Sequence, residues 1–159
     1  MGTKINKTNA ARLLDREKVA YELIPYLFDE KDLAASHVAE QLGEPLEQVF
    51  KTLVLRGDRG GILVCVVPGD EEVDLKAAAR ASGNKSVEMI PMKELLPTTG
   101  YVRGGCSPLG MKKAFPTFIH SSCLRFETVY VSAGIRGLQI RIAPADLIRL
   151  TRATVADLT

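Results

Sequence analysis

The stretch YVRGGCSPLGMKK (101–113) holds three glycines, a cysteine, a serine and three basic side chains within thirteen positions. Successive glycines allow backbone N–H groups to turn toward a phosphate or an oxyanion, because no Cβ stands in the way. The stretch does not match the pattern GxxxxGK(S/T), so it is not a Walker phosphate loop. Three interpretations stay open: a backbone cradle for an anion, a loop that presents Cys106 as a nucleophile, and a connecting turn with solvated lysines.

A cysteine nucleophile needs a base within hydrogen-bond reach. The sequence offers two histidines, His37 in a predicted helix and His120 near the end of a predicted strand. Neither can be placed beside Cys106 from the sequence, so we favour a small buried thiol for that residue. The same lack of a base argues against Ser107 or Ser132 as a nucleophile.

Lys51 lies inside the apolar run VFKTLVLR. Strand alternation places its side chain on the same face as Val49, Leu53 and Leu55. A lysine among aliphatic residues either protects the edge of a sheet or points a partly buried ammonium at something negative. Such side chains also reach out to solvent, and the sequence alone leaves these alternatives open.

A second glycine-containing turn, YVSAGIRGLQI (130–140), carries Ser132, Gly134, Arg136 and Gly137. Two such loops, with hydroxyl groups and a cation between them, could converge on one polar ligand.

The charges are unevenly distributed along the 159 residues, although the net charge is only +2. No acidic residue occurs between Glu94 and Glu127, and this interval contains Arg103, Lys112, Lys113 and Arg125. One face that meets an anionic partner would explain this pattern, and so would a chance gap in the acidic residues.

Cysteine spacing and hydropathy exclude several classes of protein. Cys65, Cys106 and Cys123 are well separated and form no CxxC pair, and the histidines have no ligand spacing, so neither a disulfide framework nor a metal site is predicted. The N-terminus is polar, and no apolar run approaches ~18 residues. We therefore expect a cytoplasmic protein with no membrane segment, and the length predicts one domain with a substantial core.

Capping residues and apolar periodicity predict helices at 6–17, 36–43, 75–83, 92–96 and 144–151. Thr8 or Asn6, Ser36 and Asp74 are the expected N-caps, and Pro97 is the expected end of the fourth helix. Strands are predicted at 19–28, 86–90, 117–122, 127–134 and 138–143, with a hairpin over 49–67. Because hairpins are mixed with crossovers and no GxGxxG turn follows a first strand, we predict an α+β domain with a mixed, curved sheet.

Three segments in this order, VFKTLV, GYVRGGCSPLGMKK and ETVYVSAGIRGLQIRIAPADL, closely resemble the YbaK/EbsC family. This family comprises free-standing bacterial Cys-tRNA(Pro) deacylases, which are relatives of the editing domain inserted in bacterial prolyl-tRNA synthetases. The resemblance runs from the first helix to about Leu150. It implies a single editing domain over residues 1–159, whose partly barrel-like sheet has about six to seven strands flanked by helices.

The family resemblance also implies a reaction. In Cys-tRNA the substrate's own thiol can attack its ester carbonyl and release a cyclic thiolactone, so that the enzyme supplies neither a nucleophile nor a cofactor. The enzyme then has to hold the ester and thiol close together and to stabilise developing negative charge.

The resemblance assigns residues to these tasks. The family's central lysine corresponds to Lys51 and its GxxxP loop to Gly104 and Pro108. Lys51 would serve the terminal phosphate, the ribose end or the thiolate, while the N–H groups of Gly104 and Gly105 would serve the oxyanion. The other expected substrate-binding or supporting residues are Tyr26, Phe28, Thr52, Cys106, Ser107, Ser132, Gly134 and Asp146.

Arg103, Lys112, Lys113 and Arg136 are expected to contact the tRNA backbone, largely without sequence preference. Discrimination between tRNAs would then come from a transient complex with prolyl-tRNA synthetase. Two alternatives stay open: a deacylase for Ala-tRNA(Pro) or other aminoacyl-tRNAs that uses water, and a non-catalytic module that binds nucleotides or tRNA.

Overall fold

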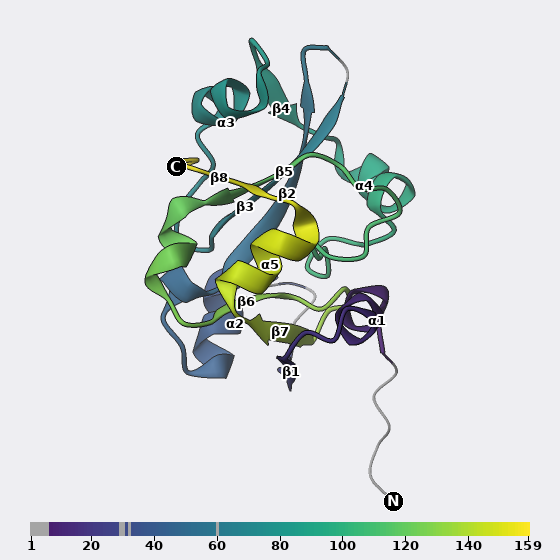
Figure 1. Cartoon of the computed structure of the whole chain (residues 1–159), viewed down its shortest axis with the longest axis vertical. Coiled ribbons are helices and arrows are strands. Elements are labelled where there is room, and N and C mark those ends of the chain that lie inside the picture. Colours follow the sequence, from purple (N-terminus) through teal and green to yellow (C-terminus); the bar gives the residue numbers. More distant parts are fainter. Residues whose placement is uncertain (1–6, 29–30, 32, 60) are drawn as a thin grey trace, which may run out of the picture.

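The computed structural model describes residues 7–28, 31, 33–59 and 61–159. Five α-helices lie in this part of the chain (Figure 1): α1 (Asn9–Arg16), α2 (Ala35–Leu42), α3 (Leu75–Ser82), α4 (Met92–Thr99) and α5 (Pro144–Thr151). The strands are β1 (Tyr21–Pro25), β2 (Phe50–Gly57), β3 (Ile62–Pro68), β4 (Val87–Met89), β5 (Thr117–His120), β6 (Val129–Ser132), β7 (Leu138–Ile142) and β8 (Thr154–Ala156). Short 3-10 helices span Leu46–Gln48 and Ser121–Arg125.

The strands form two sheets. The small sheet is antiparallel with the order β1-β7-β6, and the large one has the order β4-β2-β3-β5-β8. In the large sheet β3 pairs parallel with β5, and β5 pairs parallel with β8, while the other pairs are antiparallel. A parallel bridge between Val49 and Tyr130 joins the start of β2 to β6. The predicted α+β domain with a mixed, curved sheet is confirmed, and the described strands do not close into a barrel.

The main core lies between the two sheets. Phe50, Val64 and Ile119 of the large sheet pack in one cluster with Val131 and Ile140 of the small sheet. The helices α1 and α5 contribute to the same cluster, and Figure 1 shows α5 across the junction of the sheets and α1 beside the small one. A second cluster lies on the other face of the large sheet, under α3. The strand β3 is therefore buried on both faces, which explains its unbroken apolar sequence.

Most of the predicted helix ends are confirmed. The Thr8 hydroxyl accepts a hydrogen bond from the N–H of Ala11 (3.2 Å), and Asp74 accepts from the N–H groups of Lys76 and Ala77 at 2.9 and 3.2 Å. Gly43 and Gly83 end their helices in the left-handed conformation. These local signals fix where the helices start and stop.

Two predicted ends and one strand differ from the structure. The N-cap of α2 is Ala34 rather than Ser36. The helix α4 continues through Pro97 and ends at Gly100, whose N–H donates to the carbonyl of Leu96 (2.8 Å). Pro97 lacks the N–H that would donate to the carbonyl of Lys93, so the helix forms without that one hydrogen bond. The strand β8 was not predicted, because its pairing with β5 joins distant parts of the chain.

No helix in the described part of the chain is both long and apolar enough to span a membrane.

Candidate active site

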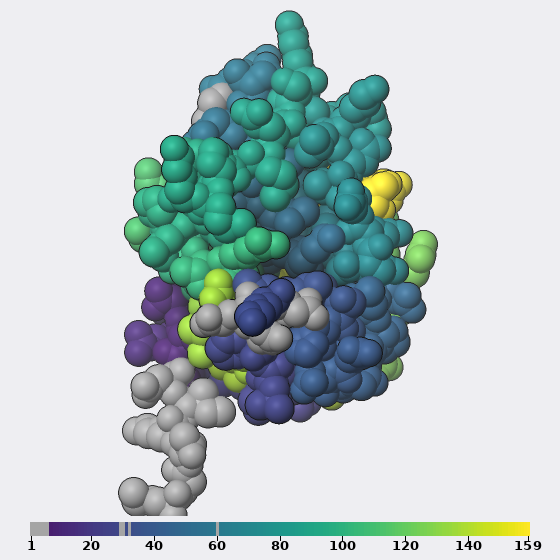
Figure 2. Space-filling view, turned by 180° about the vertical axis from the view of Figure 1, so that it is seen from behind, coloured from purple at the N-terminus to yellow at the C-terminus, as the bar shows by residue number. Residues whose placement is uncertain are grey.

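A pocket of about 480 Å³ lies between the start of β2, the end of β6, the start of β7, the first residues of the 101–113 loop and the segment leading into α2. On the face shown in Figure 2, the surface is hollowed where the green residues around position 100 meet the blue residues of α2. Seven of the predicted site residues line this pocket: Tyr26, Lys51, Thr52, Arg103, Gly104, Cys106 and Ser132.

Lys51 is the cation that β2 presents to the pocket. It lines the pocket together with its neighbours from Val49 to Leu53 on both faces of the strand, so the lining does not test the predicted alternation. Its side chain is half-buried, and no hydrogen bond or ion pair joins its ammonium to another described residue. The hydroxyl oxygen of the neighbouring Thr52 is buried and also lacks a partner within that part of the chain. The pocket wall thus carries a charge and a polar atom that the protein itself does not satisfy.

The two glycine loops lie against each other beside Lys51. The Nε of Arg136 in the second loop donates a hydrogen bond to the carbonyl of Arg103 in the first (2.8 Å). Gly105 packs so closely on the second loop that a Cβ would lie 3.0 Å from the carbonyl carbon of Ile135. The close approach of the loops therefore depends on glycine at this position.

Gly104 occupies a conformation that L residues rarely adopt, with φ +83°. A Cβ at this position would lie 3.1 and 3.2 Å from the methyl carbons of Leu33 and 3.4 Å from the Nε of Arg136. A side chain at this position would consequently need the Leu33 methyl groups to move by a few tenths of an ångström, in addition to the unfavourable φ. The N–H of Gly105 donates to the carbonyl of Val102 (2.9 Å), so the donor role for an oxyanion falls to Gly104.

The middle of the first loop, residues 105–109, is buried rather than solvated. The Ser107 hydroxyl accepts a hydrogen bond from the N–H of Leu109 (3.2 Å), and the Tyr101 hydroxyl donates to the carbonyl of Leu109 (2.6 Å). Pro108 lines a different pocket, on the far side of the loop. Ser107 and Pro108 therefore shape the loop that presents Gly104.

Gln139 lines the pocket and was not among the predicted site residues. It stands opposite Ser132 in the β6–β7 pairing, and the Ser132 hydroxyl accepts a hydrogen bond from the N–H of Gly134 (3.2 Å). Only 5% of Gln139 is exposed, and its Oε1 has no hydrogen-bond partner among the described residues. A buried amide oxygen without a partner in the protein is a ready acceptor for a ligand donor.

The remaining predicted residues lie outside the pocket lining. Phe28 is partly exposed, and its ring packs so close to Gly137 that a Cβ there would lie 3.0 Å from Cδ1. Asp146 lies on α5 with its carboxylate 3.5 Å from Arg149. The Lys112 ammonium donates to the carbonyl of Pro97 (3.3 Å), while Lys113 lines the second pocket.

Known proteins resemble this chain in sequence and in fold. The family model of the aminoacyl-tRNA editing domain matches residues 29–150. The chain belongs to this family. EbsC of Enterococcus faecalis, provisionally named as a Cys-tRNA(Pro)/Cys-tRNA(Cys) deacylase, is 48% identical over 96% of this chain and 93% of its own length.

A more distant relative and a solved structure agree with this family assignment. The proline–tRNA ligase of Thermosipho africanus is 34% identical over 48% of this chain, which corresponds to 13% of the ligase. A crystal structure described provisionally as a trans-editing enzyme for prolyl tRNA synthetase superposes with a TM-score of 0.82 at 25% identity, over 98% of this chain and 99% of that one. The predicted YbaK-like fold of this editing domain is thereby confirmed.

The thiol of Cys106 borders the pocket of this editing domain but is poorly suited to act as a nucleophile. Burial raises its pKa to about 12, and the neighbouring Thr99 hydroxyl opposes this effect only in part. The described residues that line the pocket include no histidine, and His120 lies on β5 with its Nδ1 accepting from the N–H of Leu158 (3.0 Å). A thiol that stays protonated without a base is a packing residue.

Replacing Cys106 by alanine is therefore expected to keep most of the deacylation activity. The change removes one buried sulfur and opens a small cavity beside Tyr101 and Val54, so the free energy of unfolding should fall by about 1 kcal/mol. Steady-state deacylation and thermal melting measure the two effects separately. A loss of kcat as large as that expected for a Lys51 variant would show that the thiol acts on the substrate.

Proposed function

We propose that this editing domain is a free-standing deacylase that clears Cys-tRNA(Pro) by using the thiol of the misattached cysteine. The observation that carries the proposal is the composition of the pocket. It combines an unpaired ammonium with a tightly packed glycine backbone, and the lining residues that the structure describes hold no pair of nucleophile and base. Such a pocket is suited to a substrate that brings its own nucleophile.

In the proposed reaction the substrate thiol loses its proton and the sulfur attacks the ester carbonyl carbon. A carbon–sulfur bond forms, the bond between the carbonyl carbon and the ribose oxygen breaks, and the proton ends on that oxygen. The products are a cyclic thiolactone and the free tRNA. Lys51 supports the negative charge on sulfur or on the leaving oxygen, and the N–H of Gly104 donates to the oxyanion.

The α-amino group of the substrate has an acceptor in the same pocket. Gln139 offers a buried Oε1 without a protein partner, and Ser132 lies opposite it in the sheet. A protonated amine donates up to three hydrogen bonds, and the amide oxygen can accept one of them. We assign Gln139 the task of orienting the amine, so that the thiol and the carbonyl come into contact.

The partners follow from the substrate. The acceptor end of an aminoacyl-tRNA fills the pocket, and backbone contacts of this kind do not distinguish one tRNA from another. We therefore assign the choice of tRNA to a transient complex with prolyl-tRNA synthetase. The similarity to proline–tRNA ligases supports this partner. The activity belongs in the cytoplasm, where the synthetase charges its tRNA, and the whole chain works as one editing domain.

The proposal is tested by comparing the rates of deacylation of Cys-tRNA(Pro), Ser-tRNA(Pro) and Ala-tRNA(Pro) at saturating substrate. Intramolecular attack gains a large effective concentration, so we expect cysteine to be released at least about 100-fold faster than serine or alanine. Trapping the released thiolactone would identify the product. Equal rates on the three substrates would replace this mechanism with a water-dependent deacylase, and tight binding without turnover would indicate a non-catalytic module.

A further inference from the structure

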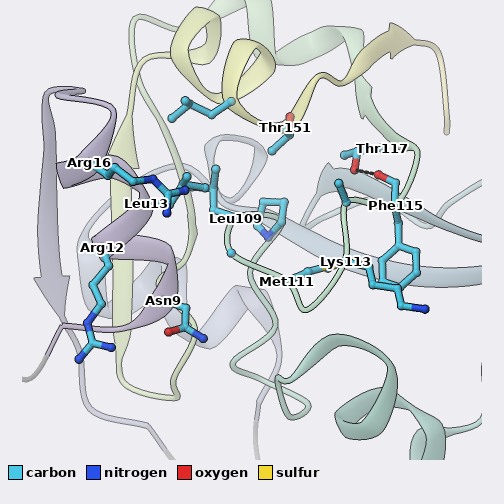
Figure 3. Close-up of a pocket in the computed structure, with 14 residues that line it drawn as sticks. Asn9, Arg12, Leu13, Arg16, Leu109, Met111, Lys113, Phe115, Thr117 and Thr151 are labelled. Carbon is cyan, nitrogen blue, oxygen red and sulfur yellow. Dashed lines mark hydrogen bonds between the residues drawn. The ribbon is translucent and has the colours of Figure 1, made fainter.

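A second pocket, of about 450 Å³, lies between α1, the 108–115 part of the first glycine loop and the end of α5. Figure 3 shows Arg12 and Arg16 of α1 on one side, Lys113 and Phe115 on the other, and Leu13 and Leu109 between them. The apolar part of the lining consists of Leu13, Leu109, Met111, Phe115 and Leu150 together with smaller groups. The pocket thus has an apolar floor and a basic rim.

The charge at this rim is only partly compensated. The described residues that line the pocket include no Asp or Glu. Arg16 lies 3.9 Å from Glu17, whereas Arg12 and Lys113 make no ion pair with any residue in the described part of the chain. Asp15, on the same helix, is already engaged by Lys7 and by the Tyr21 hydroxyl.

The spacing of the two arginines works against the helix that carries them. Arg12 and Arg16 are exposed and stand four residues apart, where like charges repel each other. Arg16 also lies in the last turn of α1, where the helix dipole favours a cation, so helix stability leaves only Arg12 unexplained. A shared negative ligand would turn the repulsion into an advantage, because both guanidinium groups could contact neighbouring phosphates.

The second pocket is joined to the proposed active site through one short loop. Gly104 and Cys106 line the first pocket, and Pro108 already lines the second. Four residues of chain reach at most about 15 Å, so the two pockets lie within a few nucleotides of each other. The loop is also fixed to α1, because a Cβ on Gly110 would lie 2.9 Å from the backbone nitrogen of Ala10.

We propose that the second pocket binds the RNA strand that leads to the aminoacylated end. The arginines Arg12 and Arg16 and the ammonium of Lys113 hold its phosphates, and an unpaired base lies on the apolar floor beside Phe115. Single-stranded RNA is commonly bound in this way, by basic grooves with an aromatic side chain under the base. The inference rests on the proposed function, since it identifies how the same substrate is held away from its ester.

The test compares two double variants in the full chain, with uncharged tRNA as the probe. Arg12→Ala/Arg16→Ala removes the two positive charges of α1. The control, Lys76→Ala/Arg80→Ala, removes two positive charges with the same spacing from the exposed face of α3. Binding is measured by fluorescence anisotropy over a series of salt concentrations, and thermal melting checks that both variants fold. We expect the α1 variant to bind several-fold more weakly, and its salt slope to fall by about 0.7 to 0.9 for each lost phosphate contact. The α3 variant should match the wild type.

Deacylation kinetics separate this inference from the proposed function. With Cys-tRNA(Pro), the α1 variant is expected to show a several-fold higher KM and an unchanged kcat, because the ester chemistry lies in the other pocket. If the wild type binds tRNA through α1 yet does not deacylate it, the proposed function fails and this inference stands. If the wild type deacylates and the α1 variant keeps both its tRNA affinity and its salt slope, the second pocket does not bind RNA.

Discussion

Replacing Lys51 by alanine is expected to lower the kcat for Cys-tRNA(Pro) deacylation by about 10²- to 10³-fold, the range seen when one stabilising group is removed from an oxyanion site. The reason is that its ammonium borders the pocket without a partner among the described residues. The charge is thus available to stabilise negative charge as the ester breaks. Single-turnover kinetics with saturating enzyme would measure the chemical step directly.

The fold should not suffer from this change. Lys51 is half-buried and unpaired in the described structure, so its removal leaves no polar group unsatisfied and the free energy of unfolding is expected to stay the same or to rise. Arg56→Ala is the matched control, since Arg56 lies on the same strand and pairs with Glu94 at 3.0 Å, away from the pocket. If the Lys51 variant is as active as the Arg56 variant, Lys51 has no role in the chemical step.

Local signals in the sequence predict most of this fold. Thr8 and Asp74 accept hydrogen bonds as N-caps, and the glycine turn after β2 forms the expected hairpin, because each of these features is decided within a few residues. The strand β8 escapes prediction, since TVA is too short to show alternation and is held by its parallel pairing with β5. The helix α4 continues past Pro97 for a different, local reason: its end is capped by Gly100 in the left-handed conformation rather than set by the proline.

The residues of the candidate site likewise include some that local sequence signals predict and some that they do not. Lys51 and Gly104 stand out in the sequence through their unusual neighbours, and both line the pocket. Gln139 does not, because in LQIRI it occupies the polar side of an alternating strand, where a solvent-exposed residue is the ordinary expectation. Its burial follows from segments far away in the chain, among them α2, whose Val38 and Ala39 pack with Tyr130 of the small sheet. The arginines of α1 were likewise unremarkable until the fold brought them beside Lys113.

Replacing Gly104 by alanine is expected to lower kcat by about 100-fold, since displacing a positioned group by about 1 Å can cost that much. Alanine at φ +83° is strained by about 1 to 2 kcal/mol, and its Cβ would press on the methyl carbons of Leu33 at 3.1 and 3.2 Å. Leu33 has to give way by a few tenths of an ångström, and we expect the strain at positive φ to move the Gly104 N–H away from the oxyanion.

Gly83→Ala is the control that separates the effect of backbone strain at positive φ from the effect of moving the Gly104 N–H. Gly83 has φ +74° at the end of α3, and no atom lies within 4 Å of the position its Cβ would take. Both variants should therefore lose a similar free energy of unfolding, about 1 to 2 kcal/mol by chemical denaturation, because both force alanine into the left-handed region. Only Gly104→Ala should also lose kcat. If the two variants are equally active, the Gly104 backbone does not stabilise the transition state, and the oxyanion must be held by another donor in the pocket.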